Sequence, residues 1–327
     1  MREASFVKQN KDKWTTFESA LSNRTNIAPD VLSDLYIEIT DHLSYAKTFY
    51  PKSNTEMYLN GLAAKAHQKI YRTKKESKNR IIGFWKTEFP TMFYHHQREL
   101  LIAFLIFAFF TAVGVFSAAN EGNFVRSILG DGYVNMTLEN IANDDPMAVY
   151  KQMGEFNMAL GITINNIIVA LVTFALGILL GIGTIYKILQ TGLMLGSFQY
   201  FFYEKGLFWE SARTIWIHGT IEISVIIVAG CAGLVLANGM LFPGTYSRLD
   251  SFQRGVRNGL KIMLSTVPFF IVAGFLEGFV TRHTEMPDWL AIFIISASLA
   301  LIVYYYIIYP RQLYKKTDHD RKPIHRI

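Results

Sequence analysis

The chain has 327 residues and a formal net charge of +6, and its composition is 51% hydrophobic but only 18% charged. Soluble globular domains carry about 25% charged residues, and here the charges crowd the two ends of the chain while the middle is almost bare. This distribution excludes an ordinary soluble domain. It also disfavours nucleic acid as a partner, because the basic residues follow the borders of apolar segments. We predict an all-α, polytopic integral membrane bundle with polar ends.

Residues 1–80 are predicted to form a cytoplasmic helical head. Trp14, Phe17 and Leu21 recur at the three- and four-residue spacing of one helix face, and Pro29 stands near the start of a second amphipathic stretch. The head ends in a basic hinge, RTKKESKNR. We expect Lys74 and Lys75 in this hinge to meet anionic lipid, with a solvated charge run as the alternative.

Residues 81–98 follow as a short amphipathic segment that begins IIGFWKTEFPTMF. It is too short to cross a bilayer, which takes about 20 apolar residues. We predict an interfacial elbow helix that is bent at Pro90 and places its aromatic side chains in the acyl boundary.

The membrane bundle is predicted to occupy residues 99–310 and to cross the bilayer about six times. The third segment is the least apolar of the six and is interrupted by glycines. The six predicted spans are Leu100–Ala119, Met158–Ile182, Thr184–Tyr203, Ile215–Ala237, Ile262–Val280 and Trp289–Tyr309.

Charges in the loops predict the orientation, because cytoplasmic loops are rich in Lys and Arg. Arg254 and Arg257 precede the fifth span, and Lys315 and Lys316 lie in a basic tail, residues 311–327. The loop at residues 120–157 is acidic. Six spans with both termini in the cytoplasm place the two basic segments on the cytoplasmic side and the acidic loop on the outer side. The tyrosines near residue 305 are expected at the interface.

Five polar residues inside the predicted spans are the candidate functional residues. His218 and Glu222 are four apart, so they share one face of a helix. With the predicted orientation, Asn165, Asn166 and Glu277 join them in a polar layer in the outer half of the membrane. Three interpretations remain open for this layer: a structural network, a transport or proton-relay site, and a metal or hydrolytic site.

No known catalytic or cofactor-binding motif accompanies this layer. The chain has no HExxH, no GxxxxGK[ST], no GxGxxG and no GxSxG. We therefore assign no catalytic residue, no metal and no cofactor from the sequence.

Glycines recur within the same spans. The pairs Gly177/Gly181 and Gly192/Gly196 have the small-xxx-small spacing that lets helices approach closely, and Gly219 follows His218 directly. Either they allow helices of one chain to pack closely, or they form the contact surface of a homodimer.

Taken together, these segments resemble the stage II sporulation protein M family of bacterial membrane proteins. The resemblance rests on INNIIVALVTFALGILLGIGTIY, QTGLMLGSF, IHGTIEISVIIVAGCAGLVLANGMLFPG and FIVAGFLEGFVT, in that order. It covers residues 1 to about 282, and the five polar residues match recurring polar positions of the family. The head resembles the cytoplasmic extension of homologues outside spore formers.

The resemblance implies a multi-pass protein of the bacterial inner membrane. We expect a non-catalytic scaffold that organises an envelope complex, since in spore formers the family positions cell-wall hydrolases. Implied partners are membrane lipids, a second copy of the chain, cell-wall hydrolases and a chaperone-type ATPase. The alternatives are a permease for a small solute or lipid that uses the polar layer, and an intramembrane metal-dependent hydrolase.

Overall fold

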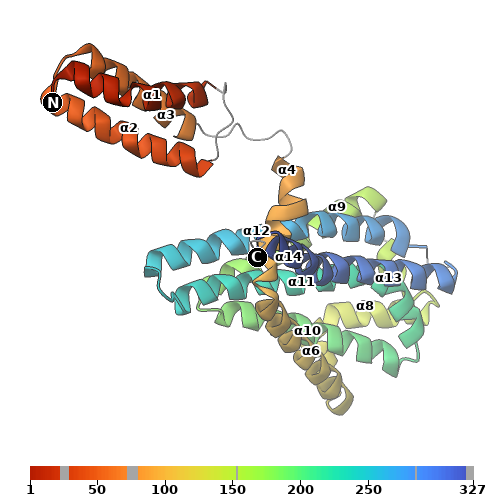
Figure 1. Cartoon of the computed structure of the whole chain (residues 1–327). Helices are drawn as coiled ribbons and strands as arrows, with labels where there is room; N and C mark the ends of the chain where they lie inside the picture. Colours follow the sequence, from red (N-terminus) through yellow and green to blue (C-terminus); the bar gives the residue numbers. More distant parts are fainter. Residues whose placement is uncertain (23–28, 72–79, 152–153, 284–285, 322–327) are drawn as a thin grey trace. The chain divides into compact units, whose positions relative to one another are not determined.

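The computed structural model describes residues 1–22, 29–71, 80–151, 154–283 and 286–321, and Figure 1 shows their helices. This described part contains no strand, as the predicted all-α fold requires. The chain divides into two compact units, Met1–Arg80 and Ile81–Ile327. We call them the head unit and the bundle unit and describe each by itself. Lys74 and Lys75 of the predicted hinge lie outside the described residues.

The head unit is a bundle of three helices, α1 (Glu3–Leu21), α2 (Pro29–Phe49) and α3 (Asn54–Tyr71). The predicted stripe of α1 faces its core, where Trp14 and Phe17 are buried. The Trp14 indole donates a hydrogen bond of 3.1 Å to the ring of His42. The unit therefore buries an aromatic core of its own, as the predicted helical head requires.

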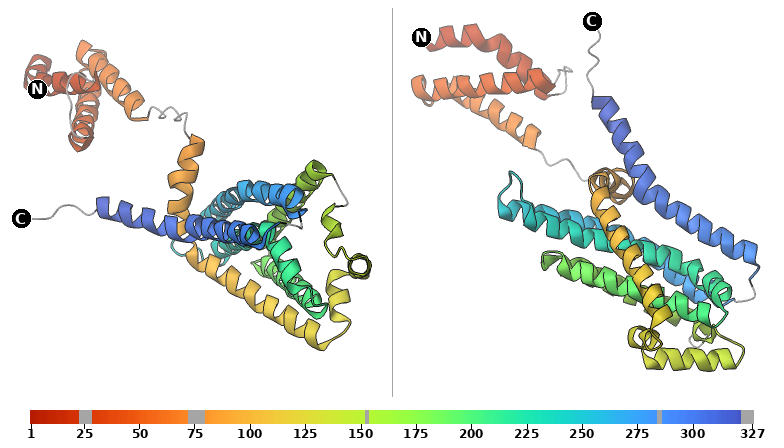
Figure 2. Two further views of the ribbon diagram at one scale, coloured as in Figure 1. Left: turned by 90° about the vertical axis from the view of Figure 1, so that its right-hand side faces the viewer. Right: turned by 90° about the horizontal axis from the view of Figure 1, so that it is seen from below.

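Long helices dominate the bundle unit, which Figure 2 shows from two further directions. Three of them continue into a tighter or wider turn: α9 into the 3₁₀ turn η3, α12 into the π-helical turn η4, and α13 through the π-helical turn η5 into α14. The bounds are α6 Gln97–Asn120, α9 Glu155–Ala175, η3 Leu176–Ile178, α10 Ile182–Glu204, α11 Phe208–Leu241, α12 Arg248–Phe275, η4 Leu276–Thr281, α13 Asp288–Val303, η5 Tyr304–Ile308 and α14 Tyr309–Arg321.

Five segments of the described chain are long and apolar enough to cross a membrane: α6, α9 with η3, α11, α12 with η4, and α13 with η5 and the first half of α14. Helix α10 corresponds to the predicted third span and is not among them, although it has 23 residues. Its hydropathy is lowered by Lys187, Gln190 and Gln199. The predicted membrane bundle is confirmed, and composition alone supports five of its six spans.

The directions of the neighbouring helices show that α10 nevertheless runs the length of the bundle. Asn166 of α9 contacts Glu222 of α11, and eleven residues further along both segments Gly177 packs on Gly233. Helices α9 and α11 are therefore parallel. Because α10 connects them with short turns, it must carry the chain back from one end of the bundle to the other.

The two ends of the bundle unit differ, and we name them by the elements found there. At the cap end, α7 (Phe124–Leu129), α8 (Asp131–Ala142) and the 3₁₀ turn η2 (Ala148–Lys151) occupy the predicted acidic loop, and the cap packs on Phe201 and Phe202 of α10. At the elbow end lie α4 (Arg80–Gly83), the π-helical turn η1 (Phe84–Glu88) and α5 (Phe89–Tyr94).

The elbow packs against the bundle through part of its length, while Ile81 and Ile82 at its start are 77% and 53% exposed. Phe89 and Phe93 are fully buried, and their rings pack on Tyr305 and Tyr306 of η5 at 5.7 and 5.5 Å between centroids. Tyr306 itself is only 1% exposed and donates a hydrogen bond to the carbonyl of Ser265. The sequence prediction missed this packing, because amphipathicity does not reveal which element covers the apolar face.

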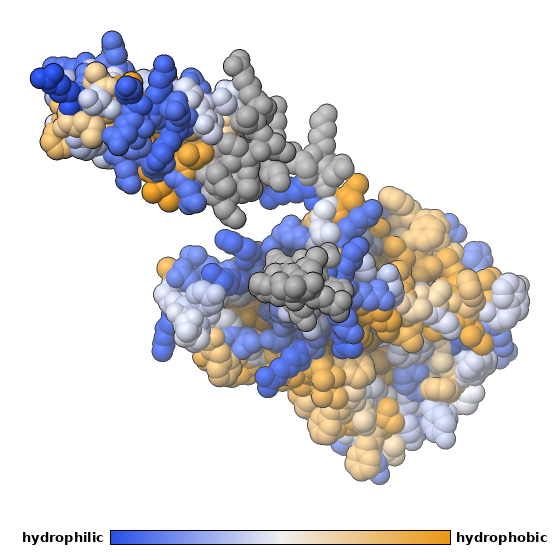
Figure 3. Space-filling model, viewed as in Figure 1, coloured by the Kyte–Doolittle hydropathy of each residue, from blue (hydrophilic) through white to orange (hydrophobic). Residues whose placement is uncertain are grey.

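Helix α11 is the centre of the bundle unit. In its most apolar window 78% of the residues are buried, against 22% in α6 and α9. Apolar side chains instead cover the outer faces of the surrounding helices, as Figure 3 shows for one side. A helix that is apolar all round and enclosed by others can place a polar side chain only where a neighbouring helix supplies a partner.

Close packing in this unit depends on glycines, which gives a prediction. A Cβ at Gly196 would lie 2.2 Å from the carbonyl oxygen of Thr111 in α6, whereas one at Gly161 would meet nothing within 4 Å. Gly196→Ala should therefore lower stability by about 1–3 kcal/mol through overpacking, and Gly161→Ala should leave it unchanged or slightly higher. Thermal unfolding in detergent measures both, and equal melting temperatures would contradict the packing role of Gly196.

Candidate functional site: a buried polar cluster beside a cavity

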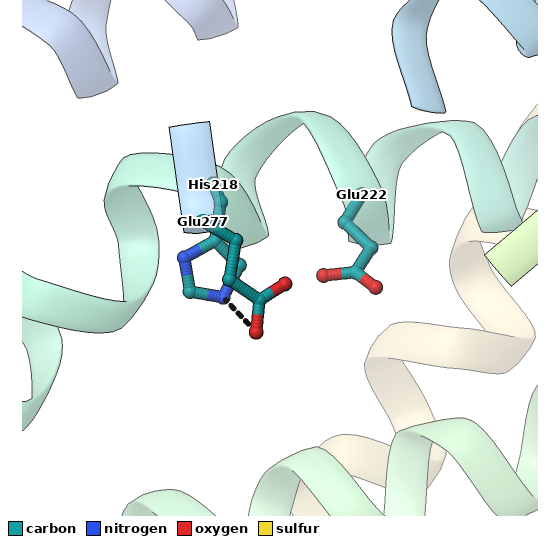
Figure 4. Close-up of side chains that lie close together, drawn as sticks. All are labelled: His218, Glu222 and Glu277. Atoms are coloured by element: carbon teal, nitrogen blue, oxygen red, sulfur yellow. Dashed lines mark ion pairs between the residues drawn. The ribbon is translucent and has the colours of Figure 1, made fainter. Parts of the chain in front are cut away.

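His218 and Glu222 lie on the same face of α11, one helical turn apart, and point toward a common space (Figure 4). His218 is 4% exposed and Glu222 is partly buried. The structure thus places these two residues on one helix face, as their spacing predicted.

Glu277 reaches the same space from η4, a π-helical turn at the end of α12. One of its carboxylate oxygens lies 3.7 Å from Nε2 of His218. Gly278, the next residue, packs against α9 so closely that a Cβ would lie 2.7 Å from the carbonyl oxygen of Glu155. Isolated π turns inside α-helices occur frequently at functional sites, and this one places Glu277 beside α11.

Two further side chains orient the pair on α11. The hydroxyl of Thr281, also in η4, lies 2.9 Å from Nδ1 of His218. The amide of Asn166 in α9 donates a hydrogen bond to Oε1 of Glu222. We call Asn166, His218, Glu222 and Glu277 the cap-end cluster, because they lie in the half of the bundle nearer the cap.

Asn165 does not join this cluster. It is exposed, while its neighbour Asn166 is buried. Adjacent residues on a helix point about 100° apart, so one of the two asparagines faces α11 and the other faces outward. The five predicted residues therefore separate into four that converge and one at the edge.

A cavity of about 770 Å³ adjoins the cluster between α9, α10 and α11. Asn165, Asn166, His218 and Glu222 line it beside the cluster. Helix α10 adds the polar side chains of Lys187, Gln190 and Thr191, and most of the other lining residues are apolar. Residues of α7 and α8 line it at the cap end. This volume is within the range of sites for small molecules, about 300–1,000 Å³.

The cap-end cluster contains more acidic than basic groups. It contains two carboxyl groups and one imidazole but no lysine or arginine. At the cap end, Arg213 and Arg282 form ion pairs of 2.8 and 2.9 Å with acidic residues outside the cluster. Buried carboxylates are ordinarily paired, protonated or bound to a cation, so the cluster is suited to taking up a positive charge.

Sequence reasoning missed a second polar cluster at the elbow end. His96 and Glu99 lie 3.8 Å apart at the start of α6. The amide of Asn238 donates a hydrogen bond of 2.9 Å to Glu99, and the amide of Asn258 lies 3.2 Å from the ring of His96. The i, i+3 spacing of His96 and Glu99 was the available signal. We call these four residues the elbow-end cluster.

The predicted glycines and basic residues fall in several places. Gly177, Gly192 and Gly196 pack against the backbone of a neighbouring helix, and Gly181 has a φ of +84° in the turn before α10. A Cβ at Gly219 would meet only Ile215, at 3.8 Å, and this glycine lines the cavity. The side chains of Arg254, Arg257, Lys315 and Lys316 are exposed. The homodimer remains a prediction.

The two asparagines form a matched pair for testing the cluster. Asn166→Ala removes the donor to Glu222 and should lower stability by about 1–3 kcal/mol, because a buried acceptor loses its partner. Asn165→Ala should change stability little. Thermal unfolding of both variants in the same detergent measures the difference, and an equal or larger loss in Asn165→Ala would show that Asn166 does not support Glu222.

Comparison with protein families agrees with the resemblance noted in the sequence. Residues 4–72 match a family described as Domain of unknown function (DUF8413). Searches of curated proteins and of solved structures found no match. Residues 103–282, more than half of the chain and including the whole cap-end cluster, match the family described as Stage II sporulation protein M. The chain therefore belongs to the stage II sporulation protein M family.

Proposed function

We propose that this protein is a membrane permease that takes an amphipathic, lipid-like molecule into the cavity between α9, α10 and α11. The observation that carries the proposal is the composition of that cavity. Most of its lining is apolar, and one part presents the amide and carboxylate groups of Asn166 and Glu222 and the ring of His218. An acyl chain matches the apolar walls, and a polar headgroup matches the cluster.

The rim of the cavity supports entry from the side. Asn165 of α9 and Tyr186, Gln190 and Met194 of α10 line the cavity and are exposed on the flank of the bundle. The end toward the cap is lined by α7 and α8. A molecule dissolved in the bilayer reaches such an opening directly, whereas a solute from water would first have to pass the cap.

An irregular helical turn beside the polar cluster also supports a permease. Glu277 lies in the π-helical turn η4, where a carboxylate oxygen is within 4.8 Å of ligand atoms of His218 and Glu222, two residues that line the cavity. Transporters commonly place their sites at discontinuous helices, where backbone geometry can change at low cost.

The chemistry of the cluster restricts the headgroup. Two carboxyl groups repel a bare phosphate placed beside them and favour an amine or several hydroxyls. Lys187 lies elsewhere along the cavity lining, near the start of α10. A lipid with a phosphate near Lys187 and a hydroxyl or amine near Glu222 satisfies both regions.

Filling the cavity tests this proposal. A Cβ at Gly219 would meet only the side chain of Ile215, at 3.8 Å, and this glycine lines the cavity, so the larger side chain of Gly219→Leu is expected to occupy part of it. Purified wild-type protein should retain an amphipathic molecule in native mass spectra, and Gly219→Leu should lose it at an unchanged melting temperature. The control Gly161→Leu, at an open position, should retain it. Equal retention in wild type and Gly219→Leu, or none in wild type, would refute the proposal.

The location proposed for this activity is the bacterial inner membrane, with both termini in the cytoplasm. The support is the charge of the loops: Arg254 and Arg257 stand at the elbow end, and the acidic segment 120–157 forms the cap. Under this orientation the lining of the cavity extends from the cap on the outer side to the first turns of α10, nearer the cytoplasmic side.

A second candidate function, a scaffold for an envelope complex, is favoured by the head unit. This unit has its own aromatic core and its own family match, as an independent docking module would. A chaperone-type ATPase is the partner that we would expect at the head unit, and cell-wall hydrolases would be expected on the outer side of the membrane. The two functions are compatible, because they use different units.

Cross-linking from the head unit tests the scaffold. A photoreactive residue at Met57, which is 62% exposed, should repeatedly capture one cytoplasmic protein in living cells. The same residue at Trp289, 70% exposed on the bundle unit, should not capture it. Capture of only extracytoplasmic proteins from Met57 would overturn both the scaffold and the proposed orientation, and an absence of specific products would count against the scaffold.

A further inference from the structure

We propose that His218, Glu222 and Glu277 bind a divalent transition-metal ion, with Zn²⁺ the ion that their chemistry fits best. The sequence alone assigned no metal here, because it contains no familiar metal-binding motif. The inference depends on the convergence of α11 and η4, which the sequence does not show.

The positions of the ligand atoms support the site. The ring nitrogen of His218 and one carboxylate oxygen from each glutamate all lie within 4.8 Å of one another. Zn²⁺ binds imidazole nitrogen and carboxylate oxygen at about 2.0–2.2 Å, which places neighbouring ligand atoms of a tetrahedral ion about 3.3 Å apart. Ion binding would therefore require the two glutamate side chains to move closer to His218.

The hydrogen bonds around the ligands have the arrangement of a metal site. Metal-binding histidines usually engage their second ring nitrogen with a neighbouring group, which fixes the ring. Here Thr281 occupies Nδ1 of His218 at 2.9 Å and leaves Nε2 toward Glu277. Asn166 binds one oxygen of Glu222 and leaves the other for an ion.

Charge gives an independent reason for a cation. Ionised Glu222 and Glu277 beside a neutral imidazole would place two negative charges in an apolar bundle, which is costly. The elbow-end cluster has a similar His–Glu distance but only one carboxyl group, and Asn238 donates to it. The cap-end cluster alone combines two carboxyl groups with a histidine among the groups within metal-binding distance in the described chain.

Three protein ligands leave one position of a tetrahedral ion open. His218 and Glu222 line the cavity, so that position faces the cavity and suits an oxygen of a bound headgroup. This last step rests on the proposed function, whereas ion binding itself does not.

Direct metal binding tests the inference on the full chain, purified without a histidine tag and stripped with a chelator. Titration with Zn²⁺ should give one ion per chain by calorimetry and elemental analysis. His218→Gln and Glu277→Gln should each weaken binding by at least about 100-fold. The matched controls His96→Gln and Glu99→Gln change the other His–Glu pair of the bundle and should leave the affinity unchanged.

If a variant fails to fold, X-ray absorption of the Zn²⁺-loaded wild-type protein still identifies the atoms that bind the ion. The expected shell contains one imidazole, oxygen ligands and no sulfur. A shell with two imidazoles or with sulfur, wild-type affinity in His218→Gln and Glu277→Gln, or no ion bound would overturn the inference.

Retention of the amphipathic molecule, measured with and without chelator, separates the two proposals. If the molecule stays while no ion binds, the cavity proposal survives and the metal proposal falls.

Discussion

The enclosure of α11 is the constraint on which the rest of the bundle unit depends. This helix has 34 residues and is buried over most of its apolar length. Glycines let its neighbours approach closely, as at the contact of Gly177 with Gly233. Because most of this helix is enclosed by other helices, a polar group on its buried faces needs a partner from one of them. His218 and Glu222 are therefore met by Thr281, Glu277 and Asn166.

Much of this architecture could be predicted from the sequence, for identifiable reasons. Apolar runs of sufficient length predicted the long helices, and i, i+4 spacing placed His218 and Glu222 on one face. Alternating directions then brought Asn166 and Glu277 to the same end. The sequence could not distinguish Asn166 from Asn165, because that choice depends on the rotation of α9 about its axis. It also could not predict the π-helical turn that aims Glu277 at His218, or the cavity, which depends on the separation of α9 and α10.

The burial of the elbow shows a second limit of sequence reasoning. The aromatic residues before α6 and those of η5 both match the pattern of an interfacial belt. The structure instead packs Phe89 and Phe93 against Tyr305 and Tyr306, and Gln97 donates a hydrogen bond to the carbonyl of Tyr306. Composition indicates affinity for an apolar environment, but that environment can be lipid or another part of the protein. Long-range contacts decide between the two.

The cap-end cluster differs from the elbow-end cluster in bringing two carboxyl groups, instead of one, to a single histidine. At the elbow end, Asn238 and Asn258 each contact one atom of the carboxylate and of the ring, while Nδ1 of His96 and Oε2 of Glu99 are buried without a hydrogen-bond partner among the described residues. At the cap end, the second carboxyl group comes from Glu277, which lies too far from His218 for a hydrogen bond. A network that served only stability would be expected to place an amide or hydroxyl there, because a second carboxylate adds repulsion and a cost of burial. That cost is removed when a cation or a ligand occupies the space between the two glutamates and His218, and the adjoining cavity provides a route by which it can arrive.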